Sequence, residues 1–233
     1  MRILGIDSST PQTSIALLEN DTLLAQTGPL ESTRPSSSIL TLLDNVLAEA
    51  GIGLDDVDGF AVTTGPGSFT GLRVGISLVK GFVISQEKPF VGVGTLEAWA
   101  ATAGPVTVPV CPVLDARKKQ VYAGWYQMRD GLPVSLQGDG VWDPEVLLRQ
   151  VKEPTCFVGN GLKVYGDLLR RELGSRFIEP SGLSEYNVAA CAARLARQRF
   201  GHEQTYDLNS LKINYIRKSE AELKYQPLTR ERS

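Results

Sequence analysis

Short apolar runs alternate along the chain with longer segments whose apolar residues recur every three or four positions. This alternation predicts an α/β protein, because strands repeat with a period of two and helices with a period of 3.6. The first strand ends at Asp7, and the next two form a hairpin around the turn Glu19-Asn20-Asp21. The strands expected in the first half of the chain cover residues 2–6, 14–18, 22–25, 59–63 and 90–93.

Three helices are predicted in this half of the chain, two of them between these strands and one after the last. The hydroxyls of Ser36, Ser37 and Ser38 can cap a helix that runs to Ala50, where Gly51 ends it. Its apolar residues cover more than one stripe, which is more than a single packed face requires and is typical of an oligomer interface. The other two helices are expected over residues 69–84 and 96–103.

After Gly104-Pro105 the order of elements begins again. A strand over residues 106–114 ends in Asp115, as the first strand ends in Asp7, and a hairpin and a helix–strand–helix series follow. Only the order repeats, since the sequences of the halves differ. We therefore expect two similar lobes with a cleft between them, over residues 1–104 and 105–233. The remaining strands are expected at 120–126, 132–136 and 156–158, and the remaining helices at 144–151, 163–173 and 185–200.

Composition narrows the classes of function. The 233 residues are 42% hydrophobic and 21% charged, with 24 Lys+Arg, 26 Asp+Glu and a net charge of −2, so the basic excess of a dedicated nucleic-acid binder is absent. The single histidine, His202, argues against a histidine-based metal centre and against any Ser-His-Asp triad that does not use it, and we expect no metal site. No run predicts a membrane span and the N-terminus resembles no signal peptide, so a cytoplasmic location is expected. Cys111, Cys156 and Cys191 are then expected as buried free thiols.

Asp7 and Asp115 each follow a strand and are the candidates for a ligand site. Ligands of α/β sheets bind at the carboxyl ends of strands, and Asp7 with Ser8 and Ser9 could hold a magnesium–phosphate unit. Asp and Ser in this position also form ordinary turns. The sequence leaves both interpretations open for a nucleotide cleft.

The run Gly65-Pro66-Gly67-Ser68-Phe69-Thr70-Gly71-Leu72-Arg73-Val74-Gly75-Ile76 carries the strongest signal. It lacks the lysine of a P-loop and the dinucleotide fingerprint. Gly67, Gly71 and Gly75 lie four residues apart and form one bare stripe. Each interior glycine costs about 1 kcal/mol relative to alanine, so we expect a closely approaching element in compensation. That element could be the chain's own sheet or helix, or another subunit.

These residues resemble the bacterial TsaB (YeaZ) family. The resemblance rests on Ile-Leu-Gly-Ile-Asp-Ser-Ser-Thr at 3–10, the glycine run at 65–76, Leu-Asp-Ala-Arg at 114–117, Val-Gly-Asn-Gly at 158–161 and Tyr-Ile-Arg at 215–217. It implies an actin/hexokinase-like (ASKHA) fold with two ribonuclease-H-like lobes. It also implies a non-catalytic subunit of the complex that makes N6-threonylcarbamoyladenosine in tRNA. Many members carry a histidine where this chain has Pro35, so any polar role of that histidine is absent.

The resemblance further implies the partners. They are the catalytic subunit TsaD, whose His-x-x-x-His metal motif this chain lacks, and the ATPase TsaE; ATP and magnesium would enter through that complex, and tRNA would be met only through it. The helices at 36–50 and 68–84 would form a bundle with TsaD, or with a second copy when the chain is alone. The expected interface residues are Leu40, Leu43, Leu47, Gly67, Gly71, Arg73, Val74, Gly75 and Leu78.

Three other functions compete with this one. An ATP-dependent phosphotransferase would use Asp7, its neighbouring hydroxyls and Asp115. A peptidase lacks metal ligands and a triad here. Direct binding of tRNA would use a basic patch such as Arg194, Arg197 and Arg199, although three arginines on one helix are more often a solvated face.

Overall fold

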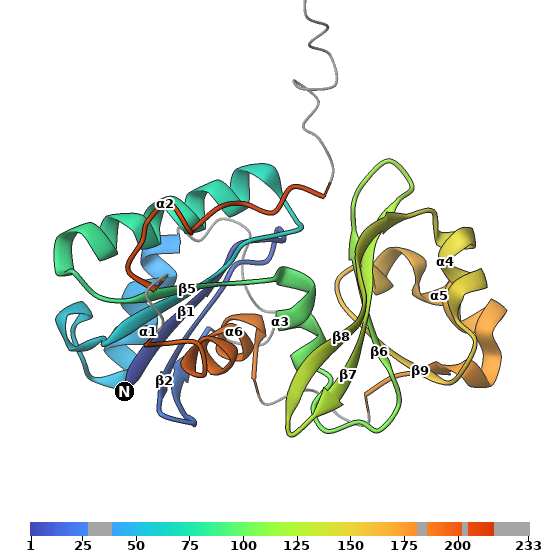
Figure 1. Ribbon diagram of the computed structural model, residues 1–233, viewed down its shortest axis with the longest axis horizontal. Coiled ribbons are helices and arrows are strands. Elements are labelled where there is room, and N and C mark those ends of the chain that lie inside the picture. Colours follow the sequence, from blue (N-terminus) through green and yellow to red (C-terminus); the bar gives the residue numbers. More distant parts are fainter. Residues whose placement is uncertain (28–38, 181–185, 202–204, 217–233) are drawn as a thin grey trace, which may run out of the picture.

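The computed structural model describes residues 1–27, 39–180, 186–201 and 205–216. Two five-stranded sheets lie side by side, each with its own helices (Figure 1). The first has the order β3-β2-β1-β4-β5, with β1 (Arg2–Asp7), β2 (Ser14–Glu19), β3 (Thr22–Gln26), β4 (Gly59–Thr63) and β5 (Phe90–Val93). The second has the order β10-β9-β6-β7-β8, with β6 (Val110–Asp115), β7 (Val121–Arg129), β8 (Leu132–Trp142), β9 (Thr155–Val158) and β10 (Phe177–Ile178).

The two sheets are built on one plan. In each sheet the first strand in the chain pairs antiparallel with the strand that follows it, β1 with β2 and β6 with β7. On its other side it pairs parallel with the strand that comes after the hairpin, β1 with β4 and β6 with β9. Asp7 and Asp115 are therefore the last residues of equivalent central strands. The twofold repeat predicted from the order of elements is confirmed.

Helices α1 (Ile39–Ala50) and α2 (Phe69–Gln86) cover one face of the first sheet. The even-numbered side chains of β1, Leu4 and Ile6, point into this core together with Leu43 of α1 and Val79 of α2. The side chain of Ser68 caps α2 by accepting a hydrogen bond from Gly71 N at 3.2 Å. The outer sides of both helices therefore point away from this face of the sheet.

The opposite face of the first sheet is covered by α6 (Val188–Arg197) and borders α3 (Thr95–Ala101). Gly5 of β1 lies so close to α6 that a Cβ there would be 2.1 Å from Ala189 O. The alanine-rich sequence of α6 permits this approach. Because α3 also packs on the second sheet, one apolar core runs from the first sheet through α6 and α3 into the second.

Helices α4 (Pro144–Gln150) and α5 (Leu162–Leu173) cover the outer face of the second sheet around a separate core. Two short 3-10 turns complete the elements, η1 (Leu54–Asp56) and η2 (Gly174–Arg176). No helix among the described residues is both long enough and apolar enough to cross a membrane.

A division of the chain between residues 104 and 105 separates the strands of the two sheets, but it does not account for α6. That helix and residues 205–216 follow the second sheet in sequence and pack against the first (Figure 1). Leu211 is buried in the core beneath α1 and α2, and Asn214 N donates to Thr64 O at 2.7 Å. The first lobe is thus completed by the end of the described chain.

Candidate functional site

A cleft of about 810 Å³ lies between the two lobes. The first lobe contributes the loop after β1, with Ser9 and Thr10, and the start of α2, with Phe69. The second lobe contributes residues 114–118, which are the end of β6 and the turn that follows it, and the start of α5. Residues 214–216 also line it. The predicted inter-lobe cleft is therefore present and has the size of a small-molecule site.

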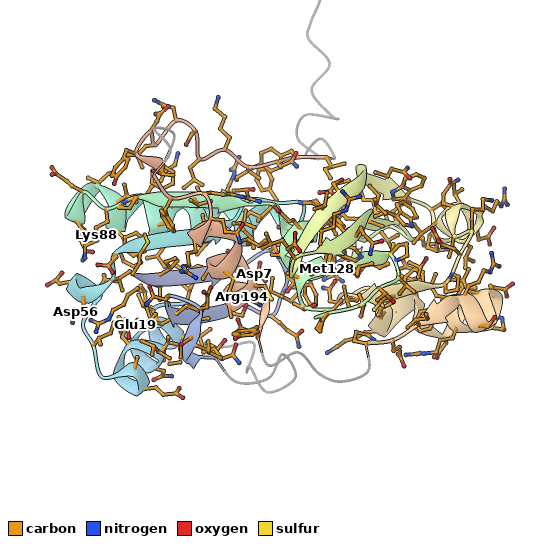
Figure 2. All side chains as sticks on the ribbon, turned by 60° about the horizontal axis from the view of Figure 1, so that its bottom comes forward. Asp7, Glu19, Asp56, Lys88, Met128 and Arg194 are labelled. Carbon is orange, nitrogen blue, oxygen red and sulfur yellow. The ribbon has the colours of Figure 1, made fainter. Side chains whose placement is uncertain are left out.

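Asp7 does not line this cleft; it lies inside the first lobe, at the end of β1 (Figure 2). Its side chain is completely buried, and its Oδ1 accepts hydrogen bonds from Thr63 Oγ1 at 2.7 Å and Ser9 N at 3.0 Å. Burial raises the pKa of the Asp7 carboxyl above its usual value, and these hydrogen bonds oppose part of the rise. By accepting the hydrogen bond from Ser9 N, Asp7 holds the loop after β1 in place.

The glycine stripe of α2 packs on that loop. A Cβ would lie 2.4 Å from Ser9 O at Gly67, 2.0 Å from Ser8 O at Gly71, and 2.3 Å from Ser8 Oγ at Gly75. The close approach that the three glycines require is therefore made within the chain. This corrects the expectation that Gly67, Gly71 and Gly75 face a partner, since the spacing identified the stripe without identifying what covers it.

The same packing decides whether the loop can hold a magnesium–phosphate unit. Ser8 Oγ donates to Gly71 O at 2.8 Å, and Ser9 O accepts from Ser68 N at 2.7 Å. The loop is thus occupied by the start of α2, and Asp7 does not reach the cleft. Among the described residues no three His, Cys, Asp or Glu side chains gather to hold a metal ion. The geometry of Asp7, Ser8 and Ser9 does not fit the magnesium–phosphate unit of a phosphotransferase.

Asp115, the equivalent residue of the second lobe, does line the cleft. Its Oδ1 accepts from Arg117 N at 2.9 Å, and its Oδ2 lies 3.4 Å from the Arg117 guanidinium. Arg117, Lys118 and Lys119 have φ angles of 61°, 52° and 60°, so three successive cationic residues form a left-handed turn at the cleft rim. The left-handed conformation costs about 1–2 kcal/mol per residue, and such cost is concentrated at functional sites.

The leucines predicted for the partner interface differ in exposure. Leu43 and Leu47 are 4% and 8% exposed in the core under α1, and Leu78 packs partly against the same core. Leu40 is 51% exposed. A charged substitution of Leu43 would therefore disturb folding before it disturbed any partner, and Leu40 is the leucine of α1 that a partner can reach.

The outer side of α2 carries a second stripe, of which the sequence analysis named only Val74. Val74 and Ile84 are 46% and 68% exposed, Ser77 and Gly81 are exposed between them, and a Cβ at Gly81 would meet nothing within 4 Å. Positions 74, 77, 81 and 84 are spaced by three and four residues, so they lie on one face. That spacing was readable in the sequence, but the denser stripe at 67–75 obscured it.

Arg73 belongs to a cluster at the mouth of the cleft. Its guanidinium carbon lies 3.8 Å from the centre of the Phe69 ring, and its Nε donates to Tyr215 Oη at 3.2 Å. The Phe69 and Tyr215 rings stack with centres 5.2 Å apart. We name Phe69, Arg73 and Tyr215 the aromatic platform; the sequence placed Arg73 at a partner interface and gave Phe69 no role.

Comparison with known proteins assigns the family. The tRNA threonylcarbamoyladenosine biosynthesis protein TsaB from Escherichia coli is 34% identical over 176 residues, which are 72% of this chain and 75% of that protein. The chain belongs to the TsaB (YeaZ) family. TsaB from Bacillus subtilis is 28% identical over 97% of this chain and 98% of its own length.

The comparison also relates the chain to a transferase. The family model of TsaD, tRNA N6-adenosine threonylcarbamoyltransferase, matches residues 28–224, so this TsaB-family chain belongs to that wider family. Among solved structures, YeaZ from Pseudomonas aeruginosa is similar with a TM-score of 0.71 and 26% identity, over 91% of this chain and 99% of that one.

The ASKHA fold expected from the resemblance is confirmed. Component A of (R)-2-hydroxyglutaryl-CoA dehydratase from Acidaminococcus fermentans superimposes with a TM-score of 0.52 at 13% identity, over 85% of this chain and 98% of that one. At this identity the likeness concerns the fold alone. All three cysteines are free and buried, as expected, and burial raises the pKa of Cys156 to about 11. His202, Pro35 and Arg217 lie outside the described residues.

Proposed function

We propose that the chain is the non-catalytic subunit of the complex that makes N6-threonylcarbamoyladenosine in tRNA in the cytoplasm. It docks TsaD through the outer sides of α1 and α2 and stabilises the competent conformation of that enzyme. TsaE is the third component, ATP and magnesium act through the complex, and the free chain forms a homodimer through the same helices. The family assignment to tRNA threonylcarbamoyladenosine biosynthesis supports this proposal.

The observation that carries the docking surface is the outer stripe of α2. A helix-interior glycine costs about 1 kcal/mol relative to alanine, and nothing within 4 Å of Gly81 offsets that cost inside the chain. Val74 and Ile84 expose apolar surface on the same side, and Leu40 does so on α1. Small residues between apolar ones let a second helix approach closely, as at packed helix pairs. We call Leu40, Val74, Gly81 and Ile84 the docking stripe.

The docking stripe replaces part of the interface expected from the sequence. Leu40 and Val74 remain in it, Leu78 lies at its edge, and the buried Leu43 and Leu47 support α1 from beneath. Gly67, Gly71 and Gly75 shape α2 from the inner side. A partner therefore meets the side of α2 that faces away from the glycine-rich packing.

The test is binding of TsaD to a Val74→Glu/Ile84→Glu variant, measured by calorimetry, together with light scattering of the free chain. We expect at least a tenfold loss of affinity and a monomeric free chain, because two charges would be buried in an apolar contact. Val146→Glu is the matched control, since Val146 is a 40% exposed helical valine of α4 in the other lobe. Normal TsaD binding by the double variant would exclude the docking stripe.

A further inference from the structure

We propose that the inter-lobe cleft binds a single-stranded segment of RNA, with a base on the aromatic platform and the phosphates on the cations of the opposite rim. The proposal extends the proposed function: the RNA of the pathway would then touch this chain directly, in addition to meeting it through the complex. It also differs from the alternative of tRNA binding by a basic patch at Arg194, Arg197 and Arg199, because none of these arginines lines the cleft.

The platform provides the first half of the site. Tyr215 and Phe69 are 41% and 38% exposed although both are large aromatic residues. They do not move freely, because the Tyr215 hydroxyl is held by Arg73 and the rings stack on each other. A preassembled pair of rings with a guanidinium is the arrangement on which unpaired bases stack, since every base has a π-face.

The opposite rim provides the second half. Among the residues that line the cleft, Arg117, Lys118 and Lys163 are cations and Asp115 is the one carboxylate, whereas the chain as a whole carries a net charge of −2. The cleft is therefore a local positive region in an acidic protein, which attracts an anionic ligand to this place and not to the surface at large.

The left-handed turn fixes the backbone from which the side chains of Arg117 and Lys118 extend. Asp115 accepts from Arg117 N, Gln120 N donates to Arg117 O at 3.0 Å, and Ala116 N donates to Gln120 O at 3.0 Å. The backbone of Arg117–Lys119 is thus held in a costly conformation by its own hydrogen bonds. If a ligand binds the cations in the positions that this turn gives them, the energetic cost of the left-handed backbone serves binding.

The kind of nucleotide follows from what the cleft lacks. The loop that would grip the phosphates of a free nucleotide with backbone groups is covered by α2, and Asp7 is too deep to bind its metal ion. The remaining contacts are exposed cations, with the Arg117 side chain 75% exposed, and an exposed stacking surface. Such contacts suit a strand whose successive phosphates pass along the rim, as in single-strand binding grooves.

The test uses the full chain and a fluorescently labelled 12-nucleotide single-stranded RNA, with binding measured by anisotropy in 50 mM and 200 mM salt. For a single strand, log K falls linearly with log[salt], with a slope of about −0.7 for each phosphate contact. With three cations engaged, we expect affinity to fall about 20-fold between the two salt concentrations. In Arg117→Gln/Lys163→Gln the fall should be only about threefold.

The platform is tested with Phe69→Ala/Tyr215→Ala, which should weaken binding about fivefold or more at either salt concentration without changing the slope. Arg149→Gln/Lys152→Gln is the matched control, because it removes one arginine and one lysine that are exposed near α4 and do not line the cleft. Far-UV circular dichroism checks that each variant is folded.

Two results would overturn the proposal. The first is that neither the free chain nor its complex with TsaD binds RNA, or that RNA binding is unchanged in both cleft variants. The other is competition by ATP or AMP as tightly as by RNA, which would make the cleft a site for free nucleotides. TsaD binding by the same variants separates the two proposals: normal docking with lost RNA binding supports the cleft, whereas lost docking with unchanged RNA binding would assign the platform to the partner.

Discussion

At the scale of single residues, Asp7 places a carboxylate where its charge is costly. The side chain is completely buried, Thr63 and Ser9 satisfy Oδ1, and Oδ2 has no hydrogen-bond partner among the described residues. Burial raises the pKa of Asp7. The folded chain therefore holds this proton at pH values where the unfolded chain, with a pKa of about 4, has released it. The free energy of unfolding then decreases as the pH rises from about 4 through the folded pKa.

Asp7→Asn tests this cost. The amide keeps an acceptor for Thr63 and Ser9 and removes the charge, so we expect the variant to gain on the order of 1 kcal/mol at pH 8 and almost nothing at pH 4. Urea unfolding of both proteins at the two pH values measures the difference. Asp44→Asn, at an exposed position of α1, should behave like the unchanged chain at both. A variant less stable than the parent at pH 8 would show that the charge is needed in the folded state.

At the scale of elements, α2 carries glycines on two faces, and the two faces have different surroundings. Gly71 faces inward, where a Cβ would lie 2.0 Å from Ser8 O, and Gly81 faces outward, where a Cβ would meet nothing within 4 Å. The inner face fixes the loop after β1, and the outer face belongs to the proposed docking stripe. Packing within the chain thus explains Gly71, whereas Gly81 has no such contact and is assigned to the partner only by our proposal.

Gly71→Ala and Gly81→Ala form a matched pair that separates these roles. We expect Gly71→Ala to destabilise the free chain by about 1–3 kcal/mol, because backbone must move to admit the methyl group. Gly81→Ala should instead stabilise it by about 1 kcal/mol, the intrinsic helix preference. Urea unfolding gives both values. If close helix contact occurs at Gly81, its variant also binds TsaD more weakly despite being more stable; equal or tighter binding would contradict that contact.

The same helix shows how far the sequence alone could go. Apolar periodicity predicted α1, α2, α5 and α6 with ends within a few residues, and the repeated order of elements predicted the two sheets, because period and order are local properties. What covers a face is not local. The spacing of Gly67, Gly71 and Gly75 could not distinguish Ser8 and Ser9 from a partner. The aromatic platform joins Phe69 to Tyr215 across 146 positions of sequence, which no periodicity reveals.

At the scale of the whole molecule, the two lobes share one core. The cluster that contains Ile3 and Ala61 of the first sheet continues through Trp99 of α3 and the alanines of α6 to Val110 and Tyr126 of the second sheet. Separation of the lobes would expose this surface on both sides. The core therefore joins the two lobes that border the cleft, with the platform on one rim and the cations on the other.

A shared core predicts that the lobes unfold together, and Gly5→Ala tests it. The added methyl group would lie 2.1 Å from Ala189 O, so it disturbs only the contact of β1 with α6 in the first lobe. Combined with Trp99→Phe, it leaves Trp125 and Trp142 as fluorescent reporters inside the second sheet, where their rings pack edge to face 5.5 Å apart. Because the core is continuous, we expect Gly5→Ala to lower the urea midpoint of this fluorescence and that of the far-UV circular dichroism by the same amount, relative to Trp99→Phe alone. A fluorescence midpoint that stays in place while the circular dichroism shifts would show that the second lobe is stable without the first.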